Sequence, residues 1–133
     1  MKIYELLEYV DELQENCFSD RVKLRWINQI EAEIQTEVLL LDIDGIRQYQ
    51  ISDREAELLV PPPYDQVYQE YLFYQIFLAQ GETERANNQA EVFNRVYTDF
   101  KRDVCRAIDD PNSAVSAAGG IAAYALARME ETV

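Results

Sequence analysis

Residues 58–100 read LLVPPPYDQVYQEYLFYQIFLAQGETERANNQAEVFNRVYTDF, and this stretch decides the fold. The three prolines at 61–63 exclude a helix upstream, because proline is tolerated only in the first turn, so a helix is predicted to begin near Tyr64. Gly81 predicts its end, since glycine readily adopts the positive φ of a helix C-cap. Acidic residues follow, where the N-terminal dipole of a second helix favours them. Two helices joined by so short a turn must lie antiparallel.

The first helix of this hairpin is apolar on nearly every side, whereas the second has one apolar stripe. The first helix repeats at three and four residues through Tyr64, Val67, Tyr68, Tyr71, Leu72, Gln75 and Leu78, with Phe73, Tyr74, Ile76 and Phe77 added around it. The second carries Ala86, Ala90, Phe93, Tyr97, Phe100, Val104 and Ile108. The first helix therefore needs more than one covering surface, and the small residues near the turn let the two helices approach closely.

The N-terminal part of the chain predicts two more helices. One apolar stripe consists of Ile3, Leu6, Leu7, Val10 and Leu13. Ser19 is a suitable N-cap for a second helix that begins at Asp20. The stripe of this long helix runs through Val22, Trp26, Ile27, Ile30, Ile34, Val38 and Leu41. The sustained period of 3.6 residues supports helix throughout.

Residues 42–59 interrupt the helical pattern. Asp44-Gly45 is a turn signal, and residues 48–51 alternate like a strand. We expect an irregular arm here, in which this alternation also allows a small β-ribbon. We predict an all-α domain over residues 1–110, a four- to five-helix bundle with a central antiparallel hairpin and the arm between helices two and three.

Residues 111–133 form a C-terminal tail with a predicted alanine-rich helix. Its apolar positions are Val115, Ala118, Ala122, Leu126 and Met129, and Gly119-Gly120 weakens it. The small side chains suit packing against another backbone. The alternative is a frayed terminal helix that only caps the core.

Composition excludes several classes of protein. A chain of 133 residues fits one domain. Its net charge of −13, without histidine, gives no basic surface for sequence-specific nucleic-acid binding. The acidic excess either serves solubility or lets DNA pass without adhesion. Neither a membrane span nor a secretory leader is apparent, so we expect no membrane partner and a cytoplasm-like compartment.

The sequence contains no recognisable catalytic motif. There is no histidine for a triad, and the glycine patterns of P-loops, Rossmann folds and nucleophile elbows are missing. We therefore predict that the chain is not an enzyme, with no catalytic residue and no cofactor.

Metal binding is also not expected. Asp42-x-Asp44-Gly45 fails as a calcium loop, because the alignment places Leu40 and Ile51 at the end ligand positions. Glu31, Glu33 and Glu37 are spaced like ligands, yet solvated helix faces look the same and no E-x-x-H partner exists. Cys17 and Cys105 lack zinc-site spacing and are most simply read as small buried hydrophobes.

The aromatic residues are the candidates for a core or an interface between subunits. A tyrosine combines an apolar ring with a polar tip, which suits both places. The candidate core or interface residues are Trp26, Ile30, Tyr64, Tyr68, Tyr71, Tyr74, Phe77, Phe93, Tyr97 and Phe100. In the arm the candidates are Asp44, Gly45 and Tyr49.

Three segments resemble a family of small head–tail connector, or neck adaptor, proteins of tailed phages and prophages, encoded near the capsid gene. VDELQENCFSDRVKLRWINQIE at 10–31 is similar to the family's first helix, loop and tryptophan-bearing second helix. LLVPPPYDQVYQEYL at 58–72 resembles the entry into its third helix, and GETERANNQAEVFN at 81–94 the junction of its third and fourth helices. The alanine-rich tail has no counterpart that we can place.

The resemblance implies a non-enzymatic structural protein. Such a subunit forms a ring, expected to be twelvefold, beneath the portal vertex and extends the DNA channel toward the tail. Its expected partners are further copies of itself, the portal protein and neighbouring tail-completion proteins, and DNA passes without sequence-specific binding. The expected location is the neck of the virion, after a period in the cytoplasm of the bacterial host. The arm and the terminal helix are candidates for reaching the portal or a neighbour.

Two alternatives come from other classes of protein. The hairpin also resembles one tetratricopeptide-like unit, which would make the chain a helical protein-interaction adaptor without a virion role. Such repeats need about three copies for stability, and no second copy is found. The other alternative is a metal enzyme built from acidic residues on a helical bundle, and the missing ligand motifs argue against it.

Overall fold

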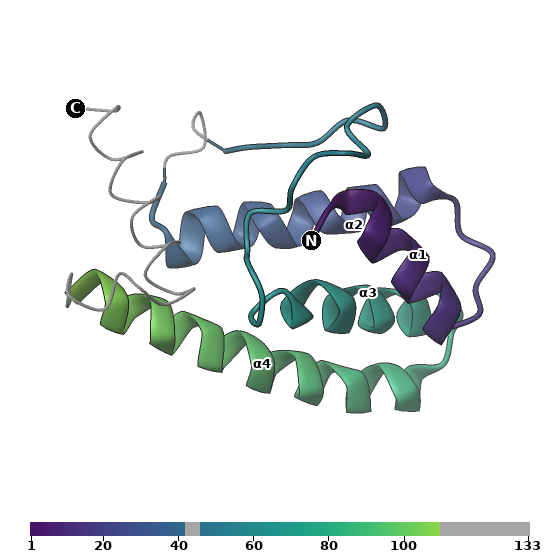
Figure 1. Ribbon diagram of the computed structural model, residues 1–133. Coiled ribbons are helices and arrows are strands. Elements are labelled where there is room, and N and C mark those ends of the chain that lie inside the picture. Colours follow the sequence, from purple (N-terminus) through teal and green to yellow (C-terminus); the bar gives the residue numbers. More distant parts are fainter. Residues whose placement is uncertain (42–45, 110–133) are drawn as a thin grey trace.

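The computed structural model describes residues 1–41 and 46–109, and these form an all-α bundle (Figure 1). The helices are α1 (Ile3–Leu13), α2 (Asp20–Glu33), α3 (Gln66–Ala79) and α4 (Thr83–Asp109), and α2 continues into the π-helical turn η1 (Ile34–Val38). Our predicted C-terminal helix and the Asp44-Gly45 turn lie outside the described residues. The predicted all-α class is confirmed.

The hairpin of α3 and α4 has the predicted antiparallel geometry (Figure 1). Gly81 has φ +78°, and the turn is closed by two hydrogen bonds: Gly81 N donates to Leu78 O, and Glu82 N to Phe77 O at 2.9 Å. This pair of bonds is a Schellman motif, which satisfies carbonyl groups left open at the end of a helix. One difference is that α3 begins at Gln66, after hydrogen-bonded turns that include Tyr64.

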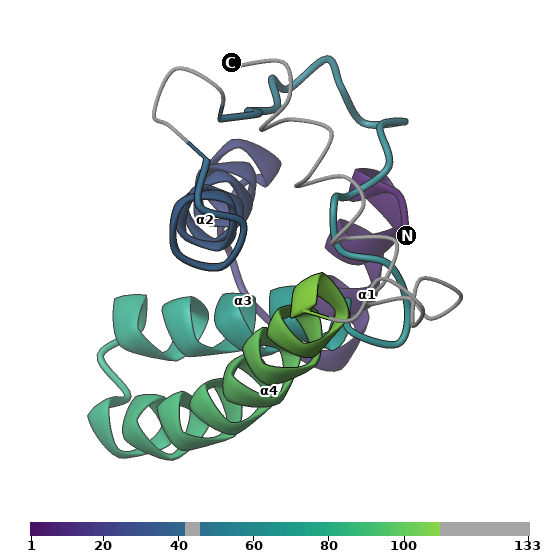
Figure 2. The same ribbon diagram turned by 90° about the vertical axis from the view of Figure 1, so that its left-hand side faces the viewer.

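Helix α3 lies in the middle of the bundle and packs against α1, α2 and α4 (Figure 2). Its side chains Tyr68, Leu72 and Ile76 are fully buried, and α2 and α4 cover it from opposite sides. This explains why the sequence of α3 is apolar all round. Because three helices of the same chain cover it, the apolar character of α3 gives no argument for neighbouring subunits.

The N-terminal helices follow most of the predicted pattern. Ser19 caps α2 by accepting a hydrogen bond from Val22 N at 3.3 Å. The stripes of α1, α2 and η1 enter one core, with two exceptions, Leu13 (56% exposed) and Val22 (37% exposed). Those two expectations were wrong, since each residue lies near an end of its helix, where no other element covers it.

The described part of the arm, for which we use residues 46–60, is irregular, with turns at 51–52 and 54–55, and is not a β-ribbon. The described residues contain a single isolated bridge, between Lys2 and Glu57, and no paired strand. The second half of the arm bonds to the N-terminus, where Ile3 N donates to Ala56 O and Leu58 N to Met1 O. Its first half pairs with the side chains of Asn28 on α2 and Gln35 on η1, so the alternation that we read as strand reflects contact with a helix.

Candidate functional site

A buried carboxylate joins the arm to the bundle. Glu31 on α2 is fully buried, and its Oε1 accepts three hydrogen bonds. The donors are the hydroxyl of Tyr68 at 2.6 Å, the backbone N of Leu59 at 2.8 Å and the hydroxyl of Tyr49 at 2.9 Å. Tyr68 belongs to α3 and the other two to the arm, so one oxygen atom connects three segments of the chain.

Both tyrosines make a second contact to the arm. The Tyr68 hydroxyl accepts a hydrogen bond from Val60 N at 2.9 Å. The Tyr49 hydroxyl also lies 3.3 Å from Glu57 O, and the guanidinium of Arg47 donates to the same carbonyl at 2.8 Å. Arg47 stands over the Tyr49 ring, 4.9 Å from its centroid. The two tyrosine hydroxyls and the Arg47 guanidinium thus pair with backbone groups of the arm in place of water.

Two amide side chains, Asn28 of α2 and Gln35 of η1, hydrogen-bond to the backbone of the arm as a neighbouring strand would. Asn28 accepts from Tyr49 N at 2.9 Å and donates to Tyr49 O at 3.0 Å. Gln35, fully buried, accepts from Arg47 N at 2.8 Å and donates to Arg47 O at 3.1 Å. Asn28 and Gln35 are two helical turns apart, and Glu31 lies between them on the same face. These three residues fix the position of the arm along the helix axis and the direction in which it runs.

Burial dominates the titration of this network. It raises the pKa of the Glu31 carboxyl, although the hydrogen bonds from Tyr68, Leu59 and Tyr49 act in the opposite direction. Burial, followed by the nearby Glu31 charge, also raises the pKa of Tyr49 and of Tyr68. Glu31 Oε2 has no hydrogen-bond partner among the described residues, so Oε2 is the atom free to take up a proton.

The Glu31 network is suited to a structural role. Its reactive groups are enclosed, and within residues 1–41 and 46–109 no three potential ligands gather as a metal site would require. The other two glutamates that we considered lie outside the core. Glu37 pairs with Lys101 at 2.9 Å, and that hydrogen bond lowers the pKa of Glu37. Burial raises the pKa of Glu33.

The ten candidate core or interface residues all lie in or against one core. The buried ones are Ile30, Tyr68, Phe77, Tyr97 and Phe100, and the half-buried ones are Trp26, Tyr64, Tyr71, Tyr74 and Phe93. Of the arm candidates, Tyr49 is buried, whereas Asp44 and Gly45 lie outside the described residues. Only Tyr68 and Tyr49 take part in the Glu31 network.

Three features were missed or misjudged from the sequence. Glu31 was read as part of a solvated face, whereas it is buried. Lys23, which we did not single out, is also buried and pairs with Asp11 and Asp20. The cysteines were expected to be buried, and both Cys17 and Cys105 are exposed. The position of Glu31 one residue after Ile30, on a buried stripe, was the one signal that could have indicated its burial.

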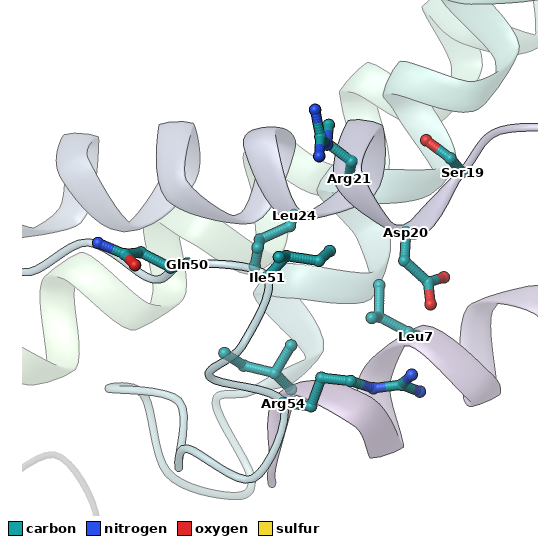
Figure 3. A pocket seen from close by; sticks show the side chains of 9 residues that line it. Leu7, Ser19, Asp20, Arg21, Leu24, Gln50, Ile51 and Arg54 are labelled. Atoms are coloured by element: carbon teal, nitrogen blue, oxygen red, sulfur yellow. The ribbon is translucent and has the colours of Figure 1, made fainter.

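A pocket of about 280 Å³ opens beside this network, between α1, the start of α2 and the arm (Figure 3). Its apolar lining is Ile3, Leu7, Leu24 and Ile51, and its polar lining is Ser19, Asp20, Arg21, Gln50 and Arg54. In Figure 3 Leu24 and Ile51 lie next to each other, with Arg21 on the α2 side and Arg54 on the arm side. The arm therefore forms one wall of the pocket.

The comparisons with known proteins give no family assignment. No protein-family model, curated protein or solved structure matches the chain. Within the described residues, no helix combines the length and apolar character needed to cross a bilayer.

Proposed function

We propose that this chain is a non-enzymatic subunit of a phage neck, a head–tail connector that assembles as a ring on a portal protein. The three sequence segments described above support the family, and an all-α bundle is the fold that the resemblance implies. The proposed partners are further copies of the chain, the portal and the tail-completion proteins. DNA is expected to pass an acidic wall without adhesion.

The arm is the observation that carries this proposal. Its inner side is fixed by Asn28, Glu31 and Gln35, while the side chains of Gln48, Ser52 and Arg54 are exposed. A segment held in one conformation before binding loses little entropy when a partner covers it. An arm of this kind suits a contact with a portal or a neighbouring subunit.

The test is the solution mass of the chain with and without its cognate portal, measured by light scattering. A defined ring that binds the portal, or a monomer that becomes a stoichiometric layer on the portal, supports the proposal. Mass that does not change when the portal is added contradicts it.

Variants of the outer arm sharpen this test. Deleting residues 45–53 would remove Tyr49 from the core, so we prefer two exposed substitutions, Gln48→Glu with Ser52→Glu. The matched control places the same changes on the exposed surface of α4, as Asn94→Glu with Thr98→Glu. Loss of portal binding by the arm variant alone supports a role of the arm, and equal binding by both variants excludes it.

The second candidate is a helical protein-interaction adaptor with no virion role. The pocket beside the arm favours this reading, because an apolar hollow with charged edges is a common form of peptide-binding site. The two candidates differ in the portal experiment, since an adaptor of this kind would not form a layer on a portal.

A further inference from the structure

The pocket between α1, α2 and the arm continues as a groove along α2. A second hollow of about 320 Å³ shares Arg21, Leu24, Gln50 and Ile51 with it and adds Arg25. An apolar cavity of about 150 Å³ is enough to admit a benzene ring. The first hollow alone therefore has room for a leucine or tyrosine side chain.

The edges of this groove are basic in a chain whose net charge is −13. Arg21, Arg25 and Arg54 are exposed, and none of them lies within 4.0 Å of a carboxylate oxygen in the part of the chain that the structure describes. Asp20, the acidic residue of the lining, is already near the buried Lys23, at 3.8 Å. The groove thus offers an apolar floor and guanidinium groups without an ion-pair partner among the described residues, which suit a segment with a large apolar side chain flanked by carboxylates.

The chain itself presents such a segment on the outer face of α1. Tyr9 and Leu13, one turn apart, are 38% and 56% exposed, although both are apolar enough to favour burial. Glu5, Glu8 and Glu12 are exposed alongside them. We name Tyr9 and Leu13 with these three glutamates the α1 knob.

We propose that the groove receives the α1 knob of a second copy of this chain. The apolar side chains of the knob enter the pocket beside Leu24 and Ile51, and its glutamates meet Arg21 and Arg54. The knob and the groove are different surfaces, so the contact is head-to-tail and leaves one free surface at each end of a pair, from which rings or filaments grow. This contact would serve the oligomer of the proposed function, and its test below requires no portal.

Overall charge does not prevent this contact. Two copies of net charge −13 repel each other at long range, but at about 0.15 M salt the Debye length is about 8 Å. Distant charges are then screened, whereas guanidinium and carboxylate groups in direct contact are screened much less. The association should therefore be measured at this ionic strength.

The experiment measures mass by sedimentation equilibrium for the full chain and two variants. Leu13→Asp disables the knob, and Ile51→Asp disables the pocket. Both residues are about half exposed, so the fold should tolerate each change, and far-UV circular dichroism checks that it does. Leu78→Asp, a change at an equally exposed leucine outside both surfaces, is the matched control.

We expect the wild type and the control to associate. Each variant should raise the dissociation constant at least about tenfold. The decisive step is to mix the two variants. Leu13→Asp retains a working groove and Ile51→Asp a working knob, so the mixture should form 1:1 pairs that cannot extend further. A wild type that stays monomeric, variants that associate like the control, or a mixture without pairs would each overturn the inference. If the chain self-associates through these surfaces but does not bind the portal, the inference of a knob-and-groove contact holds and the proposed connector function is refuted.

Discussion

The hydroxyl of Tyr68 on α3 lies 2.6 Å from Glu31 Oε1 on α2, and both side chains are fully buried. The same hydroxyl accepts a hydrogen bond from Val60 N, at the end of the arm. One phenol group thus joins two helices and the segment that runs between them. Hydrogen bonds to a charged or highly polar group in such a buried site of low dielectric constant are strong. Their loss leaves buried atoms unpaired.

Replacing Tyr68 by phenylalanine should destabilise the fold by about 1–3 kcal/mol. The ring still fills its place, but Val60 N loses its acceptor and Glu31 loses one of three donors. Urea unfolding measures the change in the free energy of unfolding. Tyr71→Phe is the control, because its hydroxyl makes only longer contacts near the surface, and we expect a loss of about 0.5 kcal/mol or less. Equal losses of unfolding free energy for the two variants would show that the contact with Glu31 stabilises the fold no more than a hydrogen bond near the surface does.

Glu31→Ala should be more destabilising than Tyr68→Phe, by about 3 kcal/mol or more in total. It leaves the buried Tyr68 hydroxyl and the half-buried Leu59 N without their acceptor. Thermal unfolding of the two variants side by side measures the order. A smaller loss for Glu31→Ala would mean that water or rearranged neighbours replace the carboxylate.

Glu31→Gln tests the titration of the network. Burial raises the pKa of the Glu31 carboxyl, so the folded chain binds this proton more tightly than the unfolded chain. Its proton-linked stabilisation is full below the unfolded pKa of about 4.3 and is lost as pH rises through the raised folded pKa. Glutamine does not titrate. The free energy of unfolding of wild type minus that of Glu31→Gln should therefore decrease from about pH 4 upward and then level off, and a difference that increases with pH would contradict the raised pKa.

Asn28→Ala should release the first half of the arm. The change removes both hydrogen bonds to the backbone of Tyr49 and should cost about 1–2 kcal/mol. Hydrogen exchange at the Tyr49 amide should accelerate, because its acceptor is gone. Asn28→Asp should show a smaller acceleration, since a carboxylate still accepts from Tyr49 N.

The control for this prediction is Gln29→Ala, an exposed neighbour on the same helix. It should leave exchange at Tyr49 unchanged. If the Asn28 and Gln29 variants exchange alike, the arm is held by burial of the Tyr49 ring and not by the amide pair.

Gly81→Ala should destabilise the hairpin by about 1 kcal/mol. A β-carbon at this position would meet no atom within 4 Å, so the cost comes from the backbone conformation with φ +78° alone. Gly81→Asn should cost less, because asparagine tolerates positive φ better than alanine. Chemical unfolding of the two variants gives the order, and equal costs would mean that the turn relaxes to another conformation.

Local signals determined the helices from the sequence. The prolines at 61–63, Gly81 and the Ser19 cap act on backbone dihedrals within a few residues, so they could be read without the fold. The apolar stripes also placed the core correctly over most of its length, including Ile30 and Tyr68. They failed at Leu13 and Val22, because exposure near the end of a helix depends on which distant element covers it.

The tertiary structure alone decided what the polar residues do. Glu31 meets Tyr49, Leu59 and Tyr68 from positions 18, 28 and 37 residues away, and no local pattern encodes these encounters. The sequence determined that the chain is an acidic helical bundle with a central hairpin. Only the packing of the arm on α2 decided which carboxylate is buried and which arginines lie at the groove with no carboxylate of residues 1–41 or 46–109 within 4.0 Å, because the environment of a charge depends on all the segments that surround it.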